Sequence, residues 1–297
     1  MPTKLQVSLV QNYNGHKQSV YCLCNDQNGG FFSGGSDGYV IHWQPGNSNE
    51  GFLFATVPEA IYCMALIPNL DMVLVGGQSG TLYYLKRGNA PIMQKLHTKG
   101  IFGIHVISED IILTVGGDGI LNVSDWYTRI HKSVQLSAQS LRAIHHANQA
   151  FYIASSDGNI YILNADFELK ETRKAHGNSI FALETANNHL ISAGRDAKLK
   201  VWNSLGENTH AIDAHWFTIH AIKVNKAQSF IATTSMDKTI RLWNAHNFTL
   251  LKVIDNVKFE GHKSSVNGCV WLSDSMFVTC SDDRSIKCWQ INIPPKI

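Results

Sequence analysis

A polar signature recurs four times along the 297 residues of this chain, and its period constrains the fold more than any other feature. Each copy has a His, then a Ser or Thr, then an Asp four positions after the hydroxyl residue and a Trp six positions after the Asp. The complete sets are His16, Ser33, Asp37 and Trp43; His176, Ser192, Asp196 and Trp202; His215, Thr233, Asp237 and Trp243; and His262, Thr279, Asp283 and Trp289. Self-similarity at an interval of about 40 residues indicates a repeat fold, because one such unit cannot bury its apolar face alone.

Three weaker copies lie between the first and the second complete set. They are VGGQSGTLYYL, TVGGDGILNVS and IASSDGNIYIL, which end at Leu85, Ser124 and Leu163. The seven segments then end near residues 43, 85, 124, 163, 202, 243 and 289, with 39 to 46 residues between neighbouring ends. This spacing is typical of a β-propeller. It predicts a single domain of seven blades over residues 1–297.

Each repeat contains short apolar runs separated by turn-forming residues. In the first repeat these runs are SVYCLC, FFSGG, YVIHW and GFLFATV. Such runs predict hairpins, and four antiparallel strands would make one blade. The last repeat leaves only INIPPKI after Gln290, whereas an unmatched strand, Lys4–Gln11, precedes the first His. We therefore expect an all-β fold in which Lys4–Gln11 supplies the outer strand of the seventh blade and closes the ring.

These residues resemble the WD-repeat family, and the resemblance extends over Lys4–Gln290. The chain departs from the family pattern after the four Trp residues, where Asn or Gln replaces the usual Asp. The resemblance implies that each Trp, hydroxyl, His and Asp form a structural hydrogen-bond chain, which ties the loop before the inner strand to the turn after the second strand. A catalytic Ser-His-Asp set would occur once, so four sets at the repeat period favour a structural role.

Three repeats have incomplete sets. The third has His97, Thr114 and Asp118, with Ser124 in the place of the Trp. The second and fourth lack the His, and their aligned His and Asp positions hold Pro58 and Ser79 in the second repeat, and Leu136 or Ser137 and Asp157 in the fourth. We expect these two blades to depend on apolar packing and to be the softest part of the ring.

The resemblance also implies a binding surface, because related propellers bind peptides across the face that carries the His-containing loops, at the mouth of the central channel. The residue five positions after each His should begin the inner strand and face that mouth. At the equivalent position of the seven aligned repeats, these residues are Tyr21, Tyr62, Phe102, Arg142, Phe181, His220 and Asn267. The residue before each turn Asp should join them, which adds Ser36, Gln78, Gly117, Ser156, Arg195, Met236 and Asp282.

Aromatic residues and Arg dominate binding hot spots. Arg142 and Arg195 come from neighbouring blades and could together receive a carboxylate or a phosphate group. We therefore expect a protein or peptide partner with an acidic or C-terminal segment. Trp216, directly after His215, would extend this patch, and Trp126-Tyr127 would cap the exterior of the third blade. Two alternatives stay open: the ring residues only plug the channel, and Trp216 only packs within its loop.

Composition argues against two other classes of function, nucleic-acid binding and catalysis. Lys and Arg number 25 and Asp and Glu 23, so the net charge of +2 lacks the basic excess of a nucleic-acid-binding protein. The mouth positions hold one acid, Asp282, and one His, His220, without paired carboxylates or a three-ligand metal set. We expect no enzyme, catalytic residue, metal or cofactor. A propeller enzyme acting on a small molecule in the channel and an RNA-associated subunit are the alternatives.

The remaining expectations concern the environment of the protein. The six cysteines, Cys22, Cys24, Cys63, Cys269, Cys280 and Cys288, lie in apolar runs and should be buried free thiols. The sequence has no apolar run long enough for a membrane helix, and its first residues lack a signal-peptide pattern. These features predict a cytoplasmic protein without a membrane partner, monomeric by itself or part of a larger complex.

Overall fold

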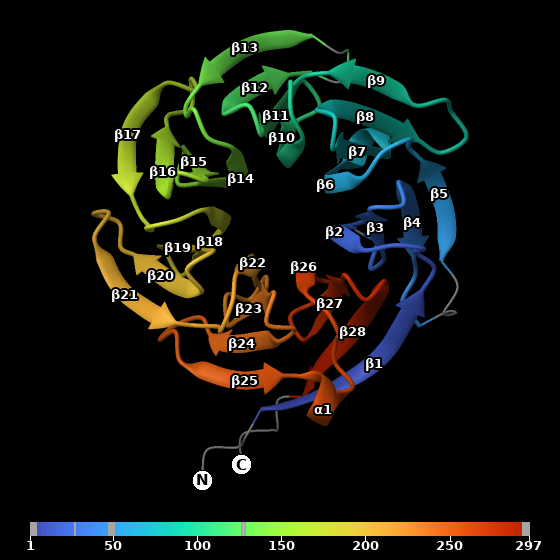
Figure 1. Cartoon of the computed structure of the whole chain (residues 1–297), viewed down its shortest axis with the longest axis vertical. Helices are drawn as coiled ribbons and strands as arrows, with labels where there is room; N and C mark the ends of the chain where they lie inside the picture. The colour runs from blue at the N-terminus through green and yellow to red at the C-terminus, as the bar shows by residue number, and fades with distance from the viewer. Residues whose placement is uncertain (1–4, 27, 47–50, 126, 128, 293–297) are drawn as a thin grey trace.

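Seven four-stranded antiparallel sheets stand around a central channel as the blades of a β-propeller (Figure 1). The computed structural model describes residues 5–26, 28–46, 51–125, 127 and 129–292. The seven-bladed, all-β architecture that the repeat period predicts is thereby confirmed.

Each of the first six blades runs from an inner strand at the channel to an outer strand at the circumference, in sequence order. Blades 1 to 3 are β2 (Val20–Asn25), β3 (Phe31–Gly35), β4 (Tyr39–Trp43) and β5 (Phe52–Thr56); β6 (Ile61–Ile67), β7 (Met72–Gly77), β8 (Thr81–Lys86) and β9 (Ile92–Lys95); β10 (Ile101–Ser108), β11 (Ile111–Gly116), β12 (Ile120–Ser124) and β13 (Ile130–Gln135). Blades 4 to 6 are β14 (Leu141–Ala147), β15 (Ala150–Ser155), β16 (Asn159–Leu163) and β17 (Leu169–Lys174); β18 (Ile180–Ala186), β19 (His189–Gly194), β20 (Lys198–Trp202) and β21 (Asn208–Asp213); β22 (Ile219–Val224), β23 (Phe230–Ser235), β24 (Ile240–Asn244) and β25 (Leu250–Ile254).

Blade 7 combines the two ends of the described chain. It consists of β26 (Val266–Trp271), β27 (Met276–Ser281), β28 (Ser285–Asn292) and β1 (Gln6–Asn14). Two short helices, η1 (Pro68–Leu70) and α1 (Asn256–Phe259), lie in connections between strands.

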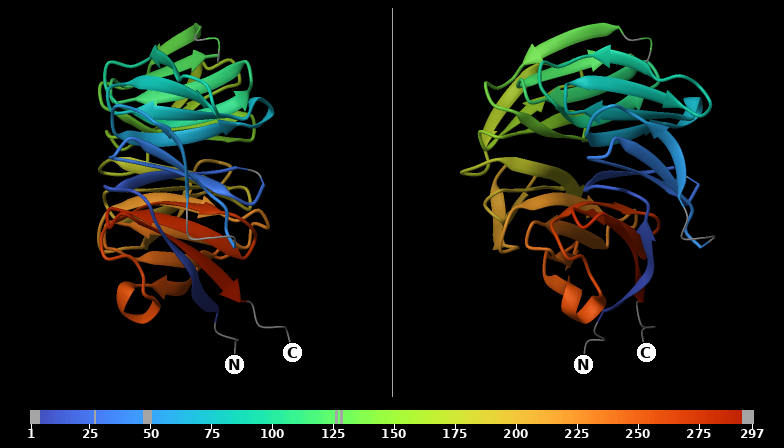
Figure 2. Two further views of the ribbon diagram at one scale, coloured as in Figure 1. Left: turned by 90° about the vertical axis from the view of Figure 1, so that its right-hand side faces the viewer. Right: turned by 45° about the vertical axis from the view of Figure 1, so that its right-hand side comes forward.

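The pairing of β1 with β28 closes the ring. The two strands run antiparallel from Gln6↔Asn292 to Asn14↔Ser285, and they lie side by side at one edge of the disc (Figure 2). This confirms the expected closure and extends the strand from Gln11 to Asn14, whereas Lys4 lies outside the described residues. Tyr13 also packs on Trp43 of blade 1, with ring centroids 5.2 Å apart. The first strand therefore joins blade 7 to blade 1 through side chains as well.

The core lies between the faces of neighbouring blades. Between blades 1 and 7, for example, Phe31 and Trp43 pack with Val278 and Ile286, and all four side chains are buried. Each Å² of apolar surface removed from water contributes about 25 cal/mol. Packing between neighbouring blades is therefore a major source of the stability of the ring.

The six cysteines are free thiols. Cys269, Cys280 and Cys288 are buried as expected, whereas Cys22, Cys24 and Cys63, which belong to the inner strands of blades 1 and 2, are only half-buried. Burial raises the pKa of Cys24 to about 12 and that of Cys288 to about 11, so these thiols stay protonated at neutral pH.

Candidate binding site at the channel mouth

Four hydrogen-bond chains hold the loops that surround the mouth. In blade 1 the indole N–H of Trp43 donates to Ser33 Oγ at 2.8 Å, Ser33 Oγ lies 2.7 Å from His16 Nε2, and His16 Nδ1 lies 3.0 Å from the carboxylate of Asp37. Buried polar groups that are paired in this way rigidify the segments they connect.

The other three complete sets form equivalent chains through their hydroxyl residues. The indole N–H of Trp202 donates to Ser192 Oγ at 2.9 Å, and this oxygen lies 2.7 Å from His176 Nε2. Thr233 Oγ1 accepts from Trp243 at 2.9 Å and lies 2.8 Å from His215 Nε2. Thr279 Oγ1 accepts from Trp289 at 3.0 Å and lies 2.9 Å from His262 Nε2. Each chain ends at a carboxylate, that of Asp196, Asp237 or Asp283.

The hydroxyl residues of the four chains lie inside the blades rather than at the mouth. Their side chains are fully buried, and the cavity at the mouth is lined by other residues; the four are Ser33, Ser192, Thr233 and Thr279. A ligand in the mouth therefore has no access to these hydroxyls. Their burial and pairing fit the structural role that the resemblance implies.

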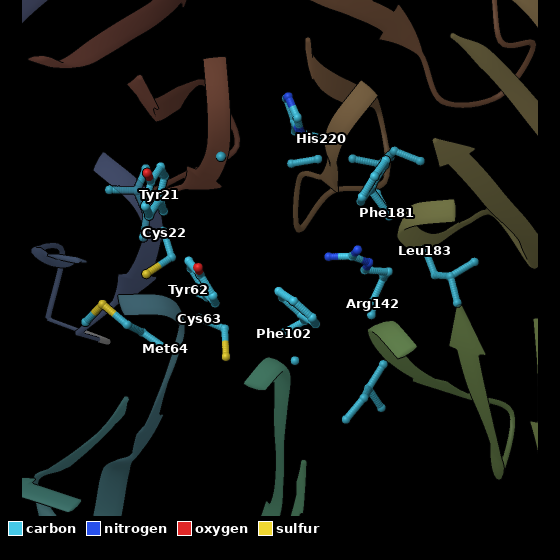
Figure 3. Close-up of a pocket in the computed structure, with 18 of the residues that line it drawn as sticks. Tyr21, Cys22, Tyr62, Cys63, Met64, Phe102, Arg142, Phe181, Leu183 and His220 are labelled. Atoms are coloured by element: carbon cyan, nitrogen blue, oxygen red, sulfur yellow. The ribbon is translucent and has the colours of Figure 1, made fainter. Parts of the chain in front are cut away.

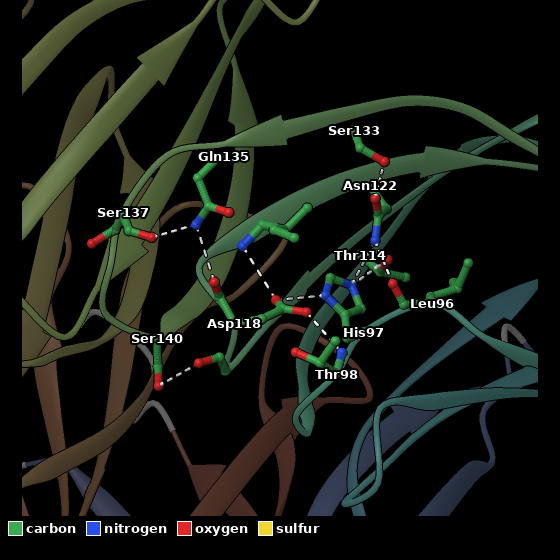
Figure 4. A network of polar contacts seen from close by, with 12 residues as sticks. Leu96, His97, Thr98, Thr114, Asp118, Asn122, Ser133, Gln135, Ser137 and Ser140 are labelled. Carbon is green, nitrogen blue, oxygen red and sulfur yellow. Dashed lines mark hydrogen bonds and ion pairs between the residues drawn. The ribbon is translucent and has the colours of Figure 1, made fainter.

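Blade 3 keeps three members of the chain. His97 contacts Thr114 Oγ1 at 3.0 Å and Asp118 at 2.9 Å (Figure 4). In place of the indole, the buried amide of Asn122 donates to the carbonyl of Leu96 at 2.8 Å. An amide on the neighbouring strand therefore ties down the loop that the Trp holds in the complete blades.

Blade 2 has a different polar network at the position of the His chain. Glu59 accepts hydrogen bonds from Tyr83 Oη at 2.6 Å, from Ser79 Oγ at 2.7 Å and from the backbone N–H of Ser79. Its carboxylate therefore replaces both the His of the loop and the Asp of the turn. This side chain directly follows Pro58, the position aligned with the missing His.

Blade 4 uses the same principle with other residues. Asp157 accepts hydrogen bonds from Ser137 Oγ and from Tyr161 Oη, both at 2.7 Å. Tyr161 stands four positions after the turn residue, as Tyr83 does in blade 2. The expectation that these two blades must rely on apolar packing is therefore wrong, because Glu59 with Tyr83 in blade 2, and the retained Asp157 with Tyr161 in blade 4, form polar networks where the His-Asp pair is missing. That they are the softest part of the ring stays a prediction.

Every inner strand carries a β-bulge at its second residue. The residues before and after the bulge pair with the neighbouring strand, and the bulged residue has no register partner. The seven bulged residues are Tyr21, Tyr62, Phe102, Arg142, Phe181, His220 and Asn267. A bulge turns a side chain out of the regular alternation of the strand, and here it directs this residue toward the channel.

These bulged residues lie around one cavity of about 520 Å³. All of them except Asn267 also line a neighbouring pocket of the channel, which Figure 3 shows from close by. Met236 and Asp282 also line this cavity, from the turns of blades 6 and 7. The other turn residues expected at the mouth do not line it; they are Ser36, Gln78, Gly117, Ser156 and Arg195. The turns lie one strand farther from the axis than the bulges, so only some of their side chains reach the opening.

Arg142 is the cation of the mouth. Its guanidinium carbon lies 4.2 Å from the ring centroid of Phe102 and 5.4 Å from that of Phe181, so aromatic rings flank it on two sides. Arg142 Nε donates to Ser156 Oγ at 2.8 Å. Burial lowers the pKa of Arg142, yet a guanidinium stays charged at neutral pH. Within the described part of the chain, no carboxylate forms an ion pair with Arg142.

Aromatic rings extend on both sides of Arg142. Tyr21 and Tyr62 have ring centroids 6.0 Å apart, Tyr62 stacks on Phe102 at 5.4 Å, and Phe181 lies 6.0 Å from the imidazole of His220. Burial lowers the pKa of His220, so this imidazole is neutral at pH 7. The mouth therefore presents a nearly continuous aromatic surface with one positive charge set into it.

The negative charge of the mouth lies in another blade. Asn267 donates to Asp282 Oδ1 at 2.8 Å and to the carbonyl of Val20 at 2.9 Å, which holds this amide and carboxylate in blade 7. Arg195 is exposed and lies outside the cavity, so the structure does not bring it to Arg142. A single arginine, rather than a pair, is available to a ligand inside the mouth.

Trp216 also lies outside the cavity, on the same face of blade 6. Its side chain is 82% exposed, so it does not pack within its own loop. The backbone N–H of Trp216 donates to Asp237 at 3.1 Å, which fixes the position of the loop. Trp126 lies outside the described residues, and its neighbour Tyr127 is exposed.

At the opposite end of the channel two lysines line the opening: Lys223 is already paired, whereas Lys226 is exposed and has no ion pair among the described residues. Lys223 Nζ lies 3.5 Å from the carboxylate of Glu184, and His145 Nδ1 lies 3.5 Å from the same carboxylate. Arg142, unlike these lysines, is held between two aromatic rings without a carboxylate partner in the described structure, which makes the mouth the better candidate for binding a charged group.

Two negative findings apply to the residues that the structure describes. They contain no cluster of three or more His, Cys, Asp or Glu side chains that could hold a metal ion. They also form no helix with the length and apolar character needed to cross a membrane.

The fold and the mouth define a β-propeller whose loops surround one aromatic and cationic opening. The sequence profile of the WD domain, G-beta repeat, matches residues 7–44, 167–203, 206–244 and 255–290, which together make up half of the chain. The chain therefore belongs to the WD40 repeat family. Blades 2 to 4, which the profile does not match, are those with incomplete polar sets.

Two curated relatives are distant in sequence. The nuclear distribution protein PAC1 of Saccharomyces cerevisiae (strain Lalvin EC1118 / Prise de mousse) is 22% identical over 313 residues, covering 85% of this chain and 62% of that protein. Lissencephaly-1 homolog 1 of Paramecium tetraurelia is 31% identical over 106 residues, covering 35% of this chain and 25% of that protein. The chain thus spans less than two thirds of the length of these relatives. The solved WD40 β-propeller domain of Doa1 superimposes with a TM-score of 0.86 at 18% identity, covering 96% of this chain and 97% of that domain, and shows the same fold.

Proposed function

We propose that this protein is a non-catalytic interaction adaptor, which binds a carboxylate-bearing segment of a partner protein at the channel mouth. Membership of the WD40 family and the likeness to PAC1 and the lissencephaly-1 homolog support an adaptor role in a general way. The observation that carries the finer proposal is Arg142, a charged side chain without a carboxylate partner in the described structure, flanked by Phe102 and Phe181.

The environment of Arg142 explains why it would bind a carboxylate. Its Nε is engaged by Ser156 Oγ, which orients the guanidinium and leaves its terminal N–H groups for a ligand. A guanidinium that donates two parallel hydrogen bonds to a carboxylate makes a strong and directional contact. The low polarity of the flanking phenyl rings strengthens such a contact, because water competes with it less.

The mouth also explains why the ligand would be a polypeptide. Tyr21, Tyr62 and Phe102 provide a broad, rigid aromatic surface of the kind that dominates protein recognition. A cavity of about 520 Å³ has room for a few amino-acid side chains. The six unpaired thiols suit a reducing compartment, so we place this adaptor inside the cell.

A display experiment tests the proposal. The full chain is used to select from two random peptide libraries, one with free C-termini and one with the random segment in the interior of a carrier protein. We expect enriched peptides to lose at least tenfold in affinity for the Arg142→Gln variant. The Arg284→Gln variant, which removes an exposed arginine on the turn of blade 7 outside the cavity, is the matched control and should bind nearly as wild type.

The outcomes separate the two interpretations of the mouth. Enrichment that depends on Arg142 supports the adaptor proposal, and the library from which the peptides come distinguishes a chain terminus from an acidic side chain. If no peptide is enriched, or if Arg142→Gln binds every selected peptide unchanged, the ring residues only fill the channel and the proposal is wrong.

A further inference from the structure

Three large apolar side chains are exposed together on blade 6. Trp216 is 82% exposed, Phe217 59% and Met236 54%, and we call these three residues the Trp216 patch. The tryptophans of the four hydrogen-bond chains are all buried, so exposure is not the rule for this residue type in the chain. Clustered, exposed aromatic side chains mark surfaces at which proteins interact.

The backbone holds the Trp216 patch in this arrangement. Met236 N–H donates to the carbonyl of Thr218 at 2.9 Å, and Ser235 Oγ donates to the carbonyl of Phe217 at 3.1 Å. The N–H of Trp216 is engaged by Asp237. A ligand would therefore meet a surface that is already ordered, which lowers the entropic cost of binding.

The patch is continuous with the channel mouth. Met236 belongs to the patch and also lines the mouth cavity, together with His220 of the same blade and Arg142. A bound polypeptide chain can therefore pass from the patch into the mouth without leaving the surface.

Exposed cations flank the patch. Arg195 lies on a turn of blade 5, and the carbonyl of Ala197 in that turn accepts hydrogen bonds at 3.1 Å from the N–H groups of Ala214 and His215, next to Trp216. Lys238 follows Met236 on the turn of blade 6, and both Arg195 and Lys238 are exposed. Among the described residues neither side chain forms an ion pair. The surroundings of the patch therefore favour a ligand with negative charge beside its apolar group.

The location of Arg142 favours a chain end over an internal acidic residue. The guanidinium lies inside the mouth between Phe102 and Phe181, so a carboxylate must reach it along the channel. A C-terminus enters such an opening as a single strand. An internal acidic residue would have to bring two lengths of chain into the same space.

Building on the proposed function of the mouth, we propose that this face binds the C-terminal segment of a partner protein. Its terminal carboxylate lies on Arg142, and an aromatic or aliphatic side chain a few residues earlier packs on the Trp216 patch. Acidic side chains near that apolar residue would meet Arg195 and Lys238. The ligand class is thus a C-terminal segment that combines apolar and acidic residues.

Defined peptides test this proposal with the full chain. The probes are fluorescein-labelled octapeptides of Gly and Ser that carry one Asp and one Phe, with the Phe moved through successive positions before the C-terminus. Each is made as the free acid and as the amide, together with a version that lacks Phe. Binding is followed by fluorescence anisotropy, and protection of Trp216 is followed by acrylamide quenching of tryptophan emission on unlabelled peptides.

We expect one Phe position to bind at least tenfold tighter as the free acid than either its amide or the peptide without Phe. The Trp216→Ala/Phe217→Ala variant should reduce binding to the level of the peptide without Phe. Val257→Ala is the matched control, because Val257 is 90% exposed on α1 at the circumference, away from the mouth, and its removal should change nothing.

The contrary outcomes are distinguishable. If Arg142→Gln abolishes binding and the patch variant binds as wild type, the inference fails while the proposed function stands. If neither variant nor amidation changes the affinity, or no peptide binds, both fail. A concentration-dependent dimer that the patch variant abolishes in sedimentation velocity would assign the patch to a second copy of the chain and overturn the inference.

Discussion

The phenol of Tyr83 donates a hydrogen bond of 2.6 Å to Glu59, at the place in blade 2 where five other blades pair a His with an Asp. Burial, together with this carboxylate, raises the pKa of Tyr83, so the phenol remains a donor throughout the physiological range. Glu59 also holds the turn at Ser79. A blade without the family signature thus keeps a polar connection between its loop and its turn.

Tyr83→Phe tests the strength of that connection. Removal of the hydroxyl leaves Glu59 without the hydrogen bond from Tyr83, so we expect the free energy of unfolding to fall by about 1–2 kcal/mol in urea denaturation. Tyr152→Phe, a half-buried tyrosine of blade 4, should change it by less than about 0.5 kcal/mol. Equal effects of the two changes would argue against a special role for the Glu59 network.

Asp196→Ala tests the structural role of the His-containing chains. Asp196 lies 2.8 Å from His176 Nδ1, and its loss leaves this nitrogen of a buried imidazole without its carboxylate partner, so the free energy of unfolding should fall by about 1–3 kcal/mol. Asp213→Ala removes a carboxylate of the same blade that is 85% exposed and pairs with Lys198, so its effect should be below about 1 kcal/mol. Lost ligand binding with unchanged stability in Asp196→Ala would instead indicate a direct role in the site.

Deletion of residues 1–14 tests the closure of the ring. The deletion removes all of β1 and with it the pairing partner of β28, as well as the packing of Tyr13 on Trp43. We expect a lower melting temperature and faster amide exchange in β28. Deletion of residues 1–4 alone should leave both unchanged, and an unchanged melting temperature in the longer deletion would contradict closure by hydrogen bonds.

The buried histidines and their aspartates predict acid sensitivity in two stages. Burial, only partly offset by the partner Asp, lowers the pKa of His215 and His262 below the usual 6.5, so the unfolded chain binds protons first as the pH falls. Stability should therefore decline once the pH falls below about 6.5. Burial alone would raise the pKa of Asp237, but hydrogen bonds from His215, Thr239 and the backbone N–H of Trp216 hold it well below the usual 3.8. The contribution of Asp237 to stability is therefore lost as the pH falls below 3.8.

Urea denaturation between pH 8 and pH 4 measures this dependence. The slope of stability against pH near pH 6 should be smaller in His262→Gln than in wild type, whereas His210→Gln, which changes an exposed histidine, should keep the wild-type slope. A stability that stays flat from pH 8 to pH 5 would contradict the account of buried neutral histidines.

Sequence reasoning succeeded where the information lies in the repeat itself. The period specified seven blades, and the unmatched first strand specified closure, because every blade needs four strands. The phase of the repeat also placed Tyr21, Arg142 and Asn267 in one ring. All seven ring residues occupy the same position in the repeat, and the β-bulge gives that position the same direction in each blade.

Sequence reasoning failed where the outcome depends on the direction of a side chain, or on a residue that replaces a member of the family signature. The phase gives the blade and depth of Arg195 but not the direction of its side chain, which is exposed and does not line the mouth cavity. Glu59 escaped notice because it is shifted from the His position, and a carboxylate there has no counterpart in the family signature. A Tyr four residues after the turn, present as Tyr83 and Tyr161, is the signal that could have revealed these networks.

Calorimetric titration of one selected C-terminal peptide measures the central claim most directly, because it compares the free acid and the amide on wild type and on Arg142→Gln. If the mouth recognises a carboxylate through Arg142, amidation should weaken binding to wild type at least tenfold and should change little on the variant. Equal loss on both proteins, or no loss on either, would contradict carboxylate recognition by Arg142.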